Sequence, residues 1–149
     1  AEYTPAVIDE LARLNQLSSV HHLRLEIETQ FLHPVEFCSQ HFQTATALRN
    51  RGITVYSNTP LFSGINDAPE IIQQIAYGCR KNGIEFHHLY IAGWPLQQKW
   101  NQNRPVDLYG VIDIASMVRR EGSGREIPAG RLISRILPWR QPCAVASPS

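Results

Sequence analysis

Polar side chains suited to acid–base chemistry and hydrogen bonding gather toward the ends of three predicted strands. They carry carboxylate, amide, hydroxyl and imidazole groups: Glu28, Gln30, Asn58, Thr59, His87, His88 and Tyr90. In a βα barrel the carboxyl ends of the strands surround one pocket, so these groups would face one ligand. The alternative is that they satisfy backbone groups in the loops that follow the strands. Their types alone assign no catalytic residue.

The positions of the histidines limit which of them can face the pocket or bind a metal. His87 and His88 would point to opposite faces of a regular strand, so at most one of them faces the pocket. His33 stands before Pro34, and its imidazole is expected to hold that loop by bonding to the backbone. The chain has no H-x-x-x-H and no C-x-x-C, whereas a zinc site needs three or four convergent ligands. The sequence therefore predicts no dedicated metal site.

Composition describes a globular protein. The chain has 149 residues, 43% hydrophobic content and a formal net charge of +1, which offers no electrostatic argument for nucleic acid or a membrane surface. No apolar run approaches the roughly 20 residues that span a bilayer. Cys38, Cys79 and Cys143 are far apart, which predicts free thiols and a cytoplasmic location.

Helical and strand periodicities alternate along the chain. Helices are predicted over 2–16, 35–50, 68–81 and 106–120, and strands over 22–29, 53–58 and 84–91. Strands joined by helices run parallel, so the predicted fold class is α/β. A long loop is expected after the third strand, and Asn66 or Asp67 is expected to cap the third helix. One domain over 1–133 and an irregular or disordered tail over 134–149 are predicted.

Three strands make a narrow sheet whose edges and faces need cover. Either a short fourth strand forms over 127–133, or the chain is part of a larger barrel. In the second case, part of an apolar barrel interior would be left uncovered. The residues at risk would be alternate members of 23–27, 53–56 and 86–91.

Several sequence blocks occur in the order found in one enzyme family. Thr29-Gln30-Phe31-Leu32-His33-Pro34-Val35-Glu36 is similar to T-H-F-N-H-P-x-E, and Asn58-Thr59 through Asn66-Asp67 is similar to Q-T-x-L-L-x-G-x-N-D. His88-Leu89-Tyr90 and the S-G-x-x-x-P pattern from Ser123-Gly124 to Pro128 follow. Together, over about 23–128, these blocks resemble the lysine 2,3-aminomutase branch of the radical S-adenosylmethionine (radical SAM) enzymes.

The resemblance implies the C-terminal half of a TIM-type radical SAM barrel and a radical isomerase that moves an amino group. Enzymes of this family cleave S-adenosylmethionine reductively at a [4Fe-4S] cluster, and the resulting 5′-deoxyadenosyl radical abstracts a substrate hydrogen. Implied contacts to S-adenosylmethionine are Gln30, Asn58 and Thr59. The implied small-molecule substrate would meet Glu28, His87, His88 and Tyr90.

Departures from the family pattern limit what the chain can do alone. The cluster motif C-x-x-x-C-x-x-C is absent, so we expect no radical chemistry without the missing N-terminal half-barrel. Either that half or a homo-oligomer is expected to cover the open part of the sheet. Lys81 and Lys99 both precede the family's Schiff-base position, so we expect no pyridoxal phosphate adduct. Gly93 stands where the family has a substrate-binding aspartate.

Two other interpretations stay open. One is a stand-alone α/β domain that binds a small molecule or a protein partner through an exposed sheet edge. The other is a metal-independent isomerase or lyase of small-barrel type, with Glu28 and a histidine as acid and base.

Overall fold

The computed structural model describes residues 3–91 and 95–121 and confirms the alternation of helix and strand. In chain order the elements are α1 (Pro5–Ser19), β1 (Glu26–Thr29), the 3₁₀ helix η1 (Pro34–Glu36), α2 (Ser39–Arg49), β2 (Thr54–Leu61), α3 (Pro69–Lys81), β3 (Glu85–Ile91), α4 (Pro95–Asn103) and α5 (Leu108–Glu121). The expected long loop after the third strand is wrong, because α4 occupies most of it. The predicted fourth strand and C-terminal tail lie outside the described residues.

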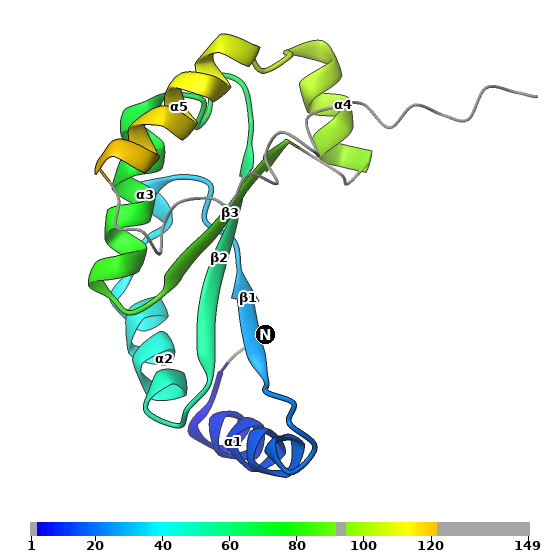
Figure 1. Ribbon diagram of the computed structural model, residues 1–149, viewed down its shortest axis with the longest axis vertical. Helices are drawn as coiled ribbons and strands as arrows, with labels where there is room; N and C mark the ends of the chain where they lie inside the picture. Colours follow the sequence, from blue (N-terminus) through cyan, green and yellow to red (C-terminus); the bar gives the residue numbers. More distant parts are fainter. Residues whose placement is uncertain (1–2, 92–94, 122–149) are drawn as a thin grey trace, which may run out of the picture.

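The three strands form one parallel sheet in the order β1-β2-β3. Ile27 pairs with Val55, and Ser57 pairs with Phe86, so β2 is the central strand. Helices α2 and α3 are the connections between successive strands, as parallel pairing requires. Figure 1 shows α2, α3 and α5 on one side of the sheet and α1 beside the amino end of β1.

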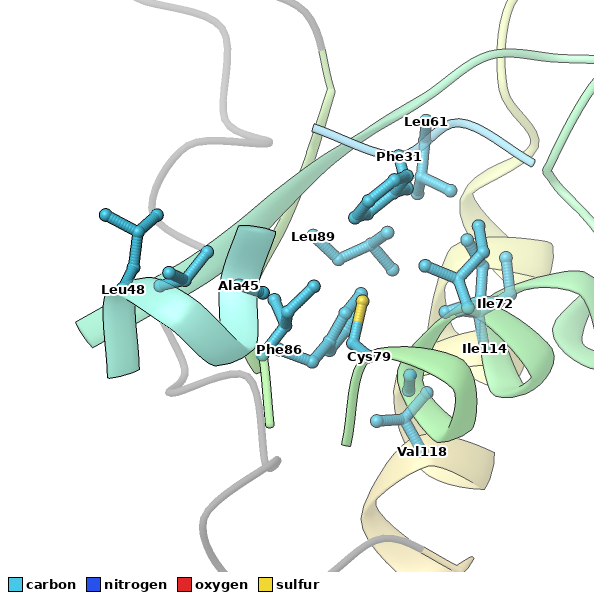
Figure 2. Close-up of a cluster of buried hydrophobic side chains, with 14 of the residues drawn as sticks. Phe31, Ala45, Leu48, Leu61, Ile72, Cys79, Phe86, Leu89, Ile114 and Val118 are labelled. Atoms are coloured by element: carbon cyan, nitrogen blue, oxygen red, sulfur yellow. The ribbon is translucent and has the colours of Figure 1, made fainter. Parts of the chain in front are cut away.

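The core lies between the sheet and the helices on that side. Ile72, Ile75 and Cys79 are spaced by three and four residues along α3, so they share one helix face, and each is 0% exposed. Phe86 and Leu89 of β3 pack toward this face (Figure 2). Burial of each isoleucine, leucine and phenylalanine side chain in this core stabilises the fold by about 1.5–3 kcal/mol.

Helix α5 forms an outer layer on α3. Val111, Ile114 and Val118 repeat at helical spacing and are all buried, and α5 packs on α3. Figure 2 places Ile114 and Val118 beside Ile72 and Cys79 of α3. Among the elements described, the sheet therefore has its helical cover on one side only.

The expectation of an uncovered apolar surface is wrong for the second and third strands and holds only around β1, where Leu23 is 64% exposed and Leu25 and Ile27 are half-buried. The apolar residues at alternate positions of these two strands, such as Val55, Phe86 and Leu89, face the helices and are buried. The side chains on the opposite face of the sheet include Glu28, Tyr56 and other polar residues. In β2 and β3 the apolar residues therefore pack on the helices of this chain, because side chains along a strand take opposite faces in turn.

Two local predictions had different outcomes. His33 does hold its loop: it is the N-cap of η1, where its Nδ1 accepts a hydrogen bond from the Val35 amide at 3.3 Å. The predicted helix cap is wrong, because the N-cap of α3 is Ala68, with Pro69 at the first helical position. Asn66 and Asp67 instead bond within their own loop.

No helix in the described part of the chain is long and apolar enough to span a bilayer.

Candidate functional site

A β-bulge brings both histidines of β3 to the uncovered face. Ser57 pairs with Phe86, but the next residue, Asn58, pairs with His88, so His87 is an extra residue in the ladder. The expectation that at most one of these histidines faces the site is therefore wrong. Their ring centroids lie 5.9 Å apart, in an edge-to-face arrangement.

Tyr56 is the centre of one group of contacts on this face. Its hydroxyl lies 3.5 Å from Glu28 Oε2 on β1, and its ring stacks on His87 with the centroids 4.7 Å apart. His87 Nε2 in turn lies 2.9 Å from Glu85 Oε2. The contacts cross all three strands, so one side-chain network fixes the acid–base groups of this part of the face.

Burial raises the pKa of the Tyr56 phenol, and the negative charges of Glu28 and Glu26 raise it further. Desolvation and nearby negative charge both disfavour a phenolate. Tyr56 therefore stays protonated at neutral pH, which makes it a hydrogen-bond donor and a proton source rather than a base. The exposed carboxylate of Glu28 accepts the hydrogen bond from the Tyr56 hydroxyl.

Two amide side chains lie nearer the carboxyl ends of the strands. Asn58 Oδ1 lies 3.1 Å from His88 Nδ1, within hydrogen-bond distance. Gln30 Nε2 donates to the Tyr90 hydroxyl at 3.2 Å. These contacts leave the Nδ2 donor of Asn58 and the Oε1 acceptor of Gln30 without a partner in the described part of the structure, so both are open to a ligand.

Thr59 does not join the other predicted site residues. It follows Asn58 on β2, so its side chain takes the opposite face, where it is 0% exposed under the helices. Its hydroxyl has no hydrogen-bond partner among the described residues, and the same holds for Ser57 two residues earlier. Glu28, Gln30, Asn58, His87, His88 and Tyr90 thus share one face, and Thr59 belongs to the core.

The thiols of the described region do not fit an iron–sulfur cluster. Cys38 is exposed just before α2, whereas Cys79 is 0% exposed in the core on α3, and a cluster needs several accessible thiolates at one place. Cys143 lies outside the described residues. Within residues 3–91 and 95–121, no group of three or more His, Cys, Asp and Glu side chains is arranged to hold a metal ion.

The two lysines lie at different places relative to the sheet. Lys81 ends α3, which runs back from the carboxyl end of β2 to the start of β3, so it lies away from the amide pair. Lys99 lies on α4 and lines a cavity next to Gln30. Neither occupies the face formed by Tyr56 and the histidines.

A cavity of about 560 Å³ lies beyond the ends of β1 and β2, and sequence reasoning missed most of its lining. Its walls come from the loops after these strands and from α4: Gln30, Leu32, Phe62, Ile65, Lys99, Trp100 and Asn103. A signal for α4 was present, since Pro95 can open a helix at its first position.

Comparison with known proteins adds no relative to these observations. No protein-family model matches the chain, and no curated protein matches it.

Proposed function

We propose that this chain is the C-terminal part of a βα barrel of the radical SAM type, resembling lysine 2,3-aminomutase, and that it forms part of the barrel's ligand-binding wall. The observation that carries the proposal is the polar sheet face opposite the helices. In a βα barrel the helices lie outside, the other face of the sheet lines the interior, and ligands bind at the carboxyl ends of the strands. The amides of Gln30 and Asn58 occupy those ends.

The residues of this face fit the polar groups of S-adenosylmethionine. Asn58 Nδ2 offers a donor and Gln30 Oε1 an acceptor, while their other amide atoms hold His88 and Tyr90 in place. In a complete enzyme, S-adenosylmethionine supplies the hydrogen-abstracting radical. The residues of this chain would orient that ligand and would present a protonated Tyr56 to the substrate.

The free edge of β1 supports a barrel that continues beyond this chain. Among the described strands, β1 pairs with β2 alone. A trough of about 950 Å³ lies beside β1, with Ile27, Ala45 and Leu48 among its lining residues. An unpaired edge with an adjacent trough can accept another strand, from the N-terminal half-barrel or from a second copy. Because the sequence lacks C-x-x-x-C-x-x-C, radical chemistry would require the N-terminal half-barrel rather than a second copy.

Titration of the full chain with S-adenosylhomocysteine, a stable relative of the ligand, tests the proposal by calorimetry. Asn58→Ala and Gln30→Ala should each weaken binding by about fivefold to tenfold, the effect of one lost hydrogen bond. Gln74→Ala, on the exposed surface of α3, is the matched control and should bind as the parent does. Equal affinity in all variants, or no binding at millimolar ligand, would remove S-adenosylmethionine from this face.

A second candidate function is a stand-alone α/β domain that binds a small molecule or a protein partner. The polar character of the uncovered face favours it, because no large apolar surface of the sheet then demands a missing half. Sedimentation at micromolar protein separates the two candidates. Self-association favours barrel completion, whereas a stable monomer with cooperative unfolding favours the stand-alone domain.

A further inference from the structure

The cavity beside α4 has the walls of a site for a flat aromatic group. Its volume of about 560 Å³ lies in the usual range for small-molecule pockets. Leu32, Ile65, Phe62 and Trp100 supply its apolar and aromatic lining. A ring inserted there would exchange water for contacts with the indole and phenyl groups, which favour offset or edge-on stacking.

These walls are held in place before any ligand arrives. Trp100 Nε1 donates to the Ser63 carbonyl at 3.2 Å, and the Trp100 ring meets Phe62 nearly edge-on, with the centroids 6.3 Å apart. The Phe62 amide donates to Asn66 Oδ1 at 2.7 Å, and Asn66 is fully buried. A pre-organised pocket spends little free energy on ordering its own side chains when it binds.

The one charged side chain on the described lining of this cavity is a lysine. Lys99 lies on its lining, and the Arg104 guanidinium lies 5.7 Å from the centroid of the Trp100 ring. Neither cation forms an ion pair with any carboxylate in the described part of the chain, and no acidic residue is among the described lining residues. Asn103 and Gln30 add amide groups to the lining. An anionic end on the ligand would complement this arrangement.

We propose that this cavity is a binding site for a small planar aromatic carboxylic acid, with its ring against Trp100 and Phe62 and its carboxylate at the Lys99 ammonium. The site is separate from the S-adenosylmethionine proposal. Gln30 is the only residue that both use, and the test below does not alter it. Failure of S-adenosylhomocysteine to bind would leave this site untouched.

The test compares 2-naphthoate with its neutral relative 2-naphthamide, both titrated calorimetrically into the full chain. The acid should bind at least about fivefold more tightly, because only it pairs with an ammonium group. Lys99→Met keeps most of the apolar stem and removes the charge, so it should erase the preference for the acid. Lys81→Met, at the end of α3, is the matched control and should keep that preference.

Lys99 is exposed and has no hydrogen bond or ion pair to another described residue, so its replacement leaves the fold intact, which circular dichroism verifies. Loss of the acid preference in Lys99→Met alone supports the site. Three results overturn it: equal affinity for acid and amide in the parent chain, the same effect in both lysine variants, or no binding of either probe.

Discussion

Replacing Asn66 by alanine should destabilise the protein more than any other single change in the loop between β2 and α3. Asn66 is 0% exposed, and its Oδ1 accepts from the Phe62 amide at 2.7 Å while its Nδ2 donates to the Pro60 carbonyl at 2.8 Å. Alanine would leave a backbone donor and a backbone acceptor without these partners. An unsatisfied buried group costs about 1–3 kcal/mol, so we expect a loss of about 2–4 kcal/mol in the free energy of unfolding.

Urea denaturation followed by circular dichroism at 25 °C measures this loss. Asp67→Ala is the control from the same loop, because Asp67 accepts one exposed hydrogen bond, from the Gly64 amide at 2.9 Å. That change should cost about 0.5–1.5 kcal/mol. If Asn66→Ala loses less than about 1 kcal/mol, or no more than Asp67→Ala, then the buried amide does not hold the loop as argued.

Three further outcomes follow from the structure. The pKa of Tyr56 is raised in the folded state, so the unfolded chain releases this proton first and the free energy of unfolding should fall as the pH rises above about 10. Tyr56→Phe should reduce this fall, as measured by urea denaturation at several pH values. An unchanged pH dependence in Tyr56→Phe would contradict the raised pKa of Tyr56. A methyl group at Gly78 would overlap the Phe37 ring, so Gly78→Ala should lower stability by about 1–3 kcal/mol, whereas Gly110→Ala, which has room, should cost nothing. Anaerobic reconstitution with iron and sulfide should give no stable visible absorbance, and a stoichiometric cluster on this chain would refute the account of its thiols.

Elements with strong periodicity could be predicted from the sequence. A helix over 106–120 is predicted from an apolar stripe of Leu108, Val111, Ile112, Ala115 and Val118, and the structure has α5 there. The buried face differs in part, because Ile114 is 0% exposed whereas Leu108 and Ile112 are more than half exposed. The order of strands and helices then requires a parallel sheet. Helix α4 was missed because its sequence, PLQQKWNQN, has few apolar residues and no clear stripe. Its position depends on tertiary contacts, such as Asn101 Nδ2 to the Leu61 carbonyl at 3.3 Å.

The roles of Asn66 and Thr59 could not be predicted from residue type. Asparagine before a helix commonly caps the first helical amides. Here the Asn66 side chain bonds instead to the Phe62 amide and the Pro60 carbonyl of its own loop. Thr59 is polar and follows Asn58 in the block that resembles the radical SAM family, yet the alternation of β2 points it into the core. Strand register outweighs polarity in deciding which side chains can reach a ligand.

The bulge at His87 could have been found from the spacing of apolar residues in β3. Phe86 and Leu89 are both buried under the helices and lie three residues apart, whereas a regular strand returns to the same face every second residue. One extra residue between them is therefore required, and both residues in that interval must then turn outward. They are His87 and His88, which meet Tyr56 and Asn58 on the uncovered face. The packing of the core on one side of the sheet thus determines that two imidazoles, rather than one, face any ligand on the other.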